Sequence, residues 1–193
     1  YMPSVGVSIS GSRGGMRGFA MRGVEANRVA ISVDGILQPD IQDNVVFSSY
    51  GLSNASRIDF DPYLASSVEI QRGANSFVSG NGALGGTVNY NTKNARDLIT
   101  KGQWGGFAHA GYNGKDNLRS FIGGAAALWK QWEALLMVTR RDGNELRNFA
   151  HGARTRNITS TQTDPTSFAQ HAWLAKLAYA PNENHHLDAA FYA

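Results

Sequence analysis

The second half of the chain consists of long runs in which apolar and polar residues alternate, and these runs restrict the possible folds more than any other feature. Each run has about the 9 to 12 residues that a tilted strand needs to cross a bilayer. The runs are Gly102–Tyr112, Asn117–Trp129, Trp132–Arg141, His171–Ala180 and His185–Ala193. Strands of soluble sheets are more often about five or six residues long. We therefore predict the start of an antiparallel transmembrane β-barrel, with a soluble antiparallel barrel or sandwich as the alternative.

The connections between these runs differ in length in the way that a membrane barrel requires. Transmembrane barrels have short periplasmic turns and longer outer loops. Lys130–Gln131 and Ala180–Asn184 are short, whereas Asp142–Gln170 has twenty-nine residues. We therefore expect the two short turns to face the periplasm, and the long loop, together with Asn113–Asp116, to lie outside.

Aromatic residues flank the predicted periplasmic turns, where a membrane girdle needs them. Trp129 and Trp132 bracket the first turn, and Tyr179 precedes the second. In the fourth run the lipid-type face is expected to hold Trp173, Ala175, Leu177 and Tyr179, with Lys176 on the other face. The second run does not sort into two faces. The runs cannot close a barrel by themselves, so their edges must pair with further chain.

Composition excludes several classes of protein. The chain has no cysteine, so disulfide scaffolds, thiol catalysis and thiolate metal sites are ruled out. No run approaches the roughly 18 apolar residues of a spanning helix. The formal net charge is only +3, so the charge balance does not demand a nucleic-acid partner. Motifs of serine hydrolases, zinc proteases and P-loop enzymes are lacking, and we do not expect an enzyme. The first residues lack the features of a signal peptide and the last lie within a predicted strand, so we expect a fragment of a longer chain.

The first half is expected to form a smaller domain around a glycine-crowded stretch, Ser67–Lys93. Strand-like alternation occurs at both ends of this stretch and again in Asn27–Asp34, which ends in an Asp-Gly turn signal. Asp61 before Pro62 predicts a short helix over Pro62–Ser67, and this capping role is a better interpretation of the acid than acid–base catalysis. The long polar connection 36–61 is of the kind that is usually functional.

Two motifs in this half have a nucleotide or nucleic-acid interpretation. Gly80, Gly82 and Gly85 spell G-x-G-x-x-G, but strand-forming residues follow them, whereas a dinucleotide site needs a helix there. The arginine-glycine cluster Gly11–Gly23 is typical of RNA-binding segments, yet it is short and contains several apolar residues. A soluble arginine-glycine RNA-binding β protein is therefore kept only as an alternative.

The order of motifs resembles TonB-dependent outer-membrane receptors, over most of the plug domain and the first barrel strands. The family pattern appears as Arg22-Gly23, Arg28–Gly35, Glu69–Gly73, Gly82–Gly86 and Val88–Lys93. The glycine-rich run and its neighbours are most similar to receptors for haemoglobin, haemoglobin-haptoglobin and haem. Ala74 and Phe77–Ser79 depart from the pattern of many siderophore receptors, which remain the alternative within the fold.

The resemblance implies an α+β plug domain, with a small mixed sheet and glycine-rich loops, over residues 1–97. Residues 98–193 would begin an antiparallel barrel of about 22 strands. It further implies a bacterial outer-membrane transporter in which TonB energises import of haem taken from haemoglobin or a related carrier. Haem is then the transported ligand rather than a covalently bound cofactor, and the partners are TonB, the haem carrier and the lipid bilayer, with no nucleic acid.

The resemblance also assigns roles to individual residues. Arg22 and Arg72 stand at the positions of the family's two plug arginines and would pair with barrel glutamates beyond residue 193, and Glu69 belongs to the same plug–barrel contact. The structural glycines are Gly73, Gly82, Gly85 and Gly86.

The haem-ligating residues are open, and no metal site is assigned. Histidine and tyrosine are chemically suitable ligands, so Tyr50 and His151 are the candidates from a plug loop and an outer loop. Arg147 and Arg154 are candidates for binding an acidic protein surface. His185 and His186 point to opposite faces of a strand and cannot chelate together, and His109 is expected to face the barrel lumen.

Overall fold

The computed structural model describes residues 5–9, 17–22, 24, 26–40, 60–74, 83–145, 167–182 and 185–193. The chain divides into two compact units, Tyr1–Lys93 and Asn94–Ala193. The division falls four residues before the boundary at residue 97 that the sequence suggests. Each unit is described by itself below.

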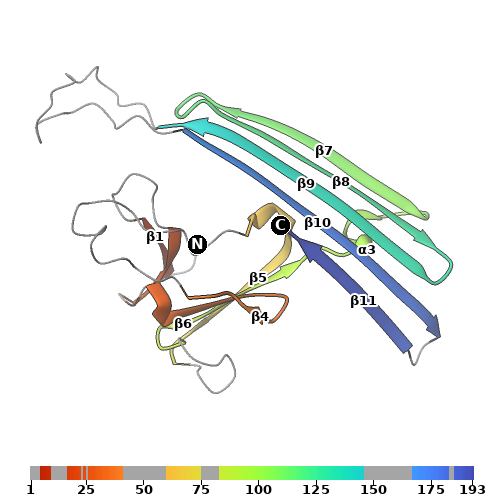
Figure 1. The fold of residues 1–193 in the computed structure, drawn as a ribbon, viewed down its shortest axis with the longest axis horizontal. Helices are drawn as coiled ribbons and strands as arrows, with labels where there is room; N and C mark the ends of the chain where they lie inside the picture. Colours follow the sequence, from red (N-terminus) through yellow and green to blue (C-terminus); the bar gives the residue numbers. More distant parts are fainter. Residues whose placement is uncertain are drawn as a thin grey trace, which may run out of the picture. The chain divides into compact units, whose positions relative to one another are not determined.

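The first unit is built on a mixed four-stranded sheet with the order β4-β3-β6-β5. Its elements are β1 (Val5–Ile9), β2 (Arg17–Met21), the 3-10 turn η1 (Ala26–Arg28), β3 (Val29–Val33), β4 (Ile36–Leu37), the 3-10 turn η2 (Pro62–Leu64), β5 (Ala65–Arg72) and β6 (Gly86–Thr92). β3 and β6 are parallel, β5 and β6 are antiparallel, and β1 and β2 form a separate ribbon (Figure 1). The predicted mixed sheet is confirmed.

The core of this unit lies along the parallel pair at the centre of the sheet. Val29, Ile31 and Val33 of β3 are buried, and so are Val88 and Tyr90 of β6. The Tyr90 ring packs 5.1 Å from that of Phe60, and burial raises the pKa of its phenol to about 12. β-Branched and aromatic residues therefore fill the two strands that hold the sheet together.

The predicted helix over Pro62–Ser67 is only partly correct. Asp61 caps the element as expected, because its Oδ1 accepts a hydrogen bond of 3.0 Å from the Tyr63 backbone N–H. The element is a single 3-10 turn that ends at Leu64, and β5 begins at Ala65. Pairing of Ala65 with Thr92 of β6 extends the strand at the expense of the helix.

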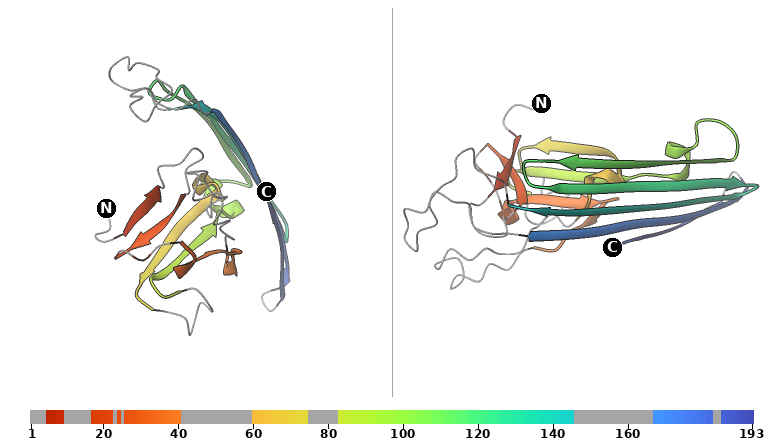
Figure 2. Two further views of the ribbon diagram at one scale, coloured as in Figure 1. Left: turned by 60° about the vertical axis from the view of Figure 1, so that its left-hand side comes forward. Right: turned by 90° about the horizontal axis from the view of Figure 1, so that it is seen from above.

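The second unit is one antiparallel meander with the strand order β11-β10-β9-β8-β7. Its elements are the helix α3 (Ala95–Leu98), β7 (Trp104–Asn113), β8 (Leu118–Trp129), β9 (Trp132–Asn144), β10 (Ser167–Asn182) and β11 (His185–Tyr192). All five predicted strands are confirmed. β9 extends to Asn144 and β10 begins at Ser167, so both strands include residues that the sequence suggested for the long loop. Figure 2 shows the sheet as a curved band, with α3 on its concave side.

Among the described residues, no helix is long and apolar enough to cross a membrane.

The helix α3 was not predicted, because Asn94–Gly102 looks like a polar connector. A capping box starts it: the Asn94 backbone N–H donates to Asp97 Oδ2 at 2.8 Å. An asparagine followed three residues later by an acid is a sequence signal for such a start, and it was missed.

The strand register assigns each residue of this sheet to one of its two faces, because directly paired residues of an antiparallel sheet point to the same side. We call the face that bears α3 the inner face and the opposite one the outer face. Buried inner-face residues are Ile122, Ala126, Leu135, Met137, Thr139, Ala172 and Leu174. Exposed apolar outer-face residues are Trp104, Tyr112, Phe121, Trp129, Trp132, Leu136, Val138, Trp173, Leu177, Leu187 and Phe191.

The outer face has the composition of a lipid-facing barrel wall. Trp129 pairs with Trp132, which pairs with Tyr179, and the last two rings lie 4.4 Å apart. This aromatic row marks the end of the sheet where the short turns are. β8, which could not be sorted from its sequence, is ordered by its register: Phe121 and Trp129 face outward while Ile122 faces inward. Glycine and alanine on both faces of β8 hide this pattern.

Candidate functional site

The glycine-rich stretch forms a tight crossing of three backbone segments in the first unit. The Gly73 N–H donates to the Gly85 carbonyl at 3.1 Å, and the Gly85 N–H donates to the Arg28 carbonyl at 2.8 Å. Gly73 and Gly86 have φ angles of +99° and +147°, in the region that glycine adopts most readily. Gly82 lies outside the described residues. Because Gly86 opens β6 rather than a helix, the glycines do not form a dinucleotide site.

Close packing requires glycine at Gly85 and Gly86, and at Gly86 the positive φ requires it as well. A Cβ on Gly85 would lie 2.7 Å from Val24 Cγ1. A Cβ on Gly86 would overlap the Gln71 carbonyl oxygen and the Met21 sulfur. The two glycines therefore let β6 start directly against β5 and β2.

The predicted contact residues lie on the surface of this crossing. Arg22, at a φ of +51°, occupies a turn closed by hydrogen bonds between Met21 and Val24. Arg72 ends β5 and is paired in register with Gly86. Both arginine side chains are exposed, and Glu69 accepts a hydrogen bond of 2.7 Å from Asn91 Nδ2. Pairing of the arginines with barrel glutamates stays a prediction.

A polar network that the sequence did not reveal ties the predicted Asp-Gly turn to β6. Asp34 accepts hydrogen bonds from the Thr92 backbone N–H at 2.7 Å and from the Thr92 hydroxyl at 2.5 Å. Asn89 accepts from the Ser32 hydroxyl at 2.8 Å and donates to Asn91 at 2.7 Å. Alternating asparagines in β6 were the available signal, but period-two polarity alone does not identify their partners.

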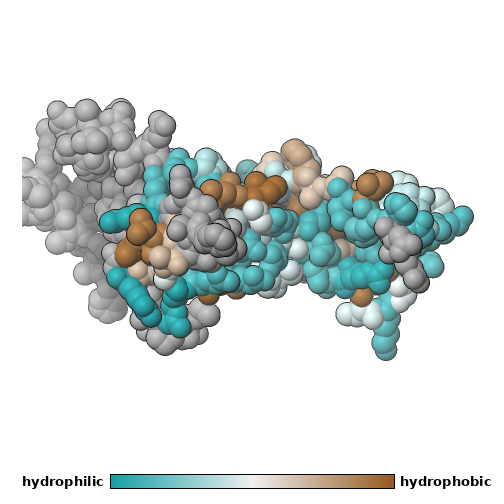
Figure 3. Space-filling model, turned by 90° about the horizontal axis from the view of Figure 1, so that it is seen from below, coloured by the Kyte–Doolittle hydropathy of each residue, from teal (hydrophilic) through white to brown (hydrophobic). Residues whose placement is uncertain are grey.

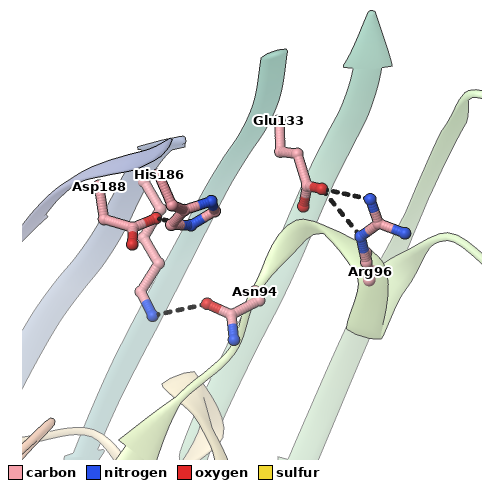
Figure 4. Close-up of polar contacts among 6 residues, drawn as sticks. Asn94, Arg96, Glu133, His186 and Asp188 are labelled. Carbon is pink, nitrogen blue, oxygen red and sulfur yellow. Dashed lines mark hydrogen bonds and ion pairs between the residues drawn. The ribbon is translucent and has the colours of Figure 1, made fainter. Parts of the chain in front are cut away.

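In the second unit, polar contacts fasten α3 to the inner face of the sheet (Figure 4). Arg96 binds Glu133 of β9 through Nε at 2.8 Å and Nη2 at 2.5 Å. Lys176 Nζ of β10 donates to Asn94 Oδ1 at 2.9 Å. The predicted inward direction of Lys176 is thus confirmed, and the first residues of the second unit are anchored to two of its own strands.

The candidate ligand-binding residues Tyr50, His151, Arg147 and Arg154 lie outside the described residues. Among the histidines that the structure describes, His185 binds Asn182 at 2.8 Å and His186 binds Asp188 at 2.9 Å, so the two rings have separate partners. His109 lies on the inner face by its register with Ile122.

The part of the chain that the structure describes contains no group of three His, Asp or Glu side chains that could hold a metal ion. Among the coloured residues in Figure 3, hydrophilic side chains predominate and apolar ones gather in small patches. The extended apolar surface described above belongs to the outer face of the second unit.

A glycine-packed mixed-sheet domain followed in the sequence by a curved meander with an aromatic-bordered apolar face is the architecture of a plug and the first barrel strands in the TonB-dependent class. Residues 1–87 match the family model described as the TonB-dependent receptor plug domain, and this part of the chain belongs to that family. Members of the family are transporters located in the bacterial outer membrane.

The similar proteins extend the match into the second unit. The chain is 34% identical over 187 residues to hemoglobin-haptoglobin-binding protein A of Haemophilus influenzae, covering 93% of this chain and 18% of that protein. It is 35% identical over 191 residues to hemoglobin and hemoglobin-haptoglobin-binding protein B of the same species, and this match covers 92% of this chain and 18% of that protein. The chain therefore spans about a fifth of the length of these relatives.

A solved structure shows the same fold. The FrpB iron transporter of Neisseria meningitidis (F5-1 variant) superposes with a TM-score of 0.75 at 23% identity, covering 98% of this chain and 27% of that one. At this identity the likeness concerns the arrangement of the strands and does not specify a ligand.

Proposed function

We propose that the intact protein binds haemoglobin or a related haem carrier at the cell surface and imports haem into the periplasm, with TonB supplying the energy. The observation that carries this proposal is the 34% identity, across both units, to a relative named for haemoglobin-haptoglobin binding. The plug and barrel-wall architecture supports it, because such a fold can separate ligand binding outside from release inside. The soluble RNA-binding alternative is not retained, since residues 1–87 belong to an outer-membrane family.

Specific residues are proposed for each step. Arg22 and Arg72, which are exposed in this structure, seat the plug by pairing with barrel carboxylates, because guanidinium groups that become buried in the intact receptor require charged partners, and Glu69 belongs to the same plug–barrel contact. Tyr50 and His151 are the haem-ligand candidates, and Arg147 and Arg154 meet acidic residues of the carrier protein. All of these roles are proposals from sequence position.

Binding of haemoglobin by the purified intact receptor tests the proposal. Immobilised haemoglobin should retain the detergent-solubilised receptor. The double variant Arg147→Ala/Arg154→Ala should bind haemoglobin about tenfold more weakly, because it removes two positive charges that would face acidic residues across the interface. Lys115→Ala, which removes a positive charge from the β7–β8 loop, is the matched control and should bind as the parent does. An intact, folded receptor that does not bind haemoglobin or a haemoglobin-haptoglobin complex would contradict the proposal.

A further inference from the structure

Within the strands of the second unit, the charged side chains of the outer face lie at the end opposite the aromatic row, while at the row itself the turn residue Lys130 places its ammonium 5.5 Å from the Trp129 ring centroid. Arg119 of β8 is paired with Asp142 of β9, and Arg140 of β9 is paired with His171 of β10. All four point outward, because the register places them in line with the outer-face residues. We call them the outer basic cluster. The described outer-face strand residues at the short-turn end are uncharged, and the positive charge there comes from the turn residue Lys130, which has no arginine or carboxylate beside it in the strand register.

The cluster lies where the apolar surface stops. Phe121 is paired with Arg140, Tyr112 is paired with Arg119, and Trp173 is the outer-face residue next to His171. From Trp132 to Arg140 the strand advances eight residues, which at about 3.4 Å per residue and a tilt of about 40° is roughly 21 Å of height. The ten-residue advance along β8 from Trp129 to Arg119 gives, with the same rise and tilt, a height of roughly 26 Å. The apolar band of such barrels is about 25 Å tall, so the cluster lies at the level of the lipid headgroups.

The chemistry of the cluster fits an anion with several oxygens. Arg140 contacts Asp142 through Nε at 2.7 Å and through Nη2 at 3.5 Å, while 61% of its side chain is exposed. A guanidinium has five N–H donors, so donors remain for a second anion. With one carboxylate against two arginines and a histidine, the cluster has a net positive charge. Arginine at such a place favours bidentate binding to phosphate.

We propose that the outer basic cluster binds the phosphate group of a lipid in the outer leaflet, with the acyl chains lying along the aromatic and aliphatic outer face below it. Asp142 orients Arg140 and limits the affinity by competing for the guanidinium. The site concerns the barrel wall and its membrane, so it is independent of whether the transported ligand is haem.

The test uses the intact receptor in a non-ionic detergent, with diphosphorylated lipid A as the probe and native mass spectrometry as the readout. The double variant Arg119→Ala/Arg140→Ala should bind the probe at least about tenfold more weakly than the parent. Lys130→Ala removes an exposed positive charge at the short-turn end and should leave binding unchanged. Dephosphorylated lipid A should bind the parent as weakly as the double variant binds the probe.

A second variant gives an effect of opposite sign that misfolding cannot produce. Asp142→Asn removes the competing carboxylate and should tighten binding of diphosphorylated lipid A severalfold. Equal binding of the phosphorylated and dephosphorylated probes, unchanged binding by the double variant, or weaker binding by Asp142→Asn would each overturn the proposal. Displacement of the lipid by millimolar inorganic phosphate would also overturn it, because the site would then recognise free phosphate rather than a lipid.

Discussion

Replacing Gly86 by alanine is expected to open the plug sheet at the start of β6, with a loss of about 2 to 5 kcal/mol in local stability. A side chain at its φ of +147° is strained by about 1 to 2 kcal/mol. The new Cβ must also displace the Gln71 carbonyl and the Met21 sulfur, and overpacking of this kind costs about 1 to 3 kcal/mol more.

The matched control is Gly35→Ala. Gly35 has a φ of +80°, but a Cβ there would meet nothing within 4 Å, so only the backbone strain applies. Hydrogen exchange in the intact receptor, followed on peptides that cover β5 and β6, measures the difference. The four tryptophans of the chain lie at 104, 129, 132 and 173, so their fluorescence does not report on the first unit. Equal exchange in the two variants would contradict the close-packed crossing.

Replacing Leu136 by arginine is expected to reduce the stability of the barrel by about 2 to 4 kcal/mol, because its position near the middle of the outer face would place a charge in the bilayer midplane. Leu136 is 51% exposed in the chain, so the same change on a soluble sheet would be close to neutral. Reversible urea unfolding of the intact receptor in lipid vesicles measures the free energy.

Gln131→Arg is the control for this substitution, since it adds the same charge in the turn between β8 and β9. We expect the free energy of unfolding of this variant to lie within about 1 kcal/mol of the parent's, because a charge near the membrane–water interface costs little. A Leu136→Arg variant as stable as Gln131→Arg would show that the outer face does not contact lipid.

The extent to which the sequence predicts the fold differs between the two units. The five long strands were predictable because lipid contact and strand geometry both impose a period of two over many residues. β8 was the exception, because its alternating positions hold small residues such as Gly123 and Gly124, which have no side chain to distinguish the faces. Only pairing with β7 and β9 orders them.

Short elements were harder to predict. The four-residue α3 is stabilised by Arg96 and Asn94 through partners about 40 and 80 residues away, in β9 and β10. Such contacts leave no periodic pattern in the sequence. The network of Asp34 with Thr92 is similarly non-local, so turn chemistry predicts the turn but not its partner.

The most direct test of TonB-dependent haem import is growth on haemoglobin as the only source of haem. The host is a bacterium that has an outer membrane, cannot synthesise haem and produces the intact receptor. Two strains that differ only in functional TonB should be compared, with receptor levels matched by immunoblot. We predict growth when both the receptor and TonB are present and none when either is missing. Equal growth with and without TonB, or no growth on haemoglobin despite receptor in the outer membrane, would contradict the account.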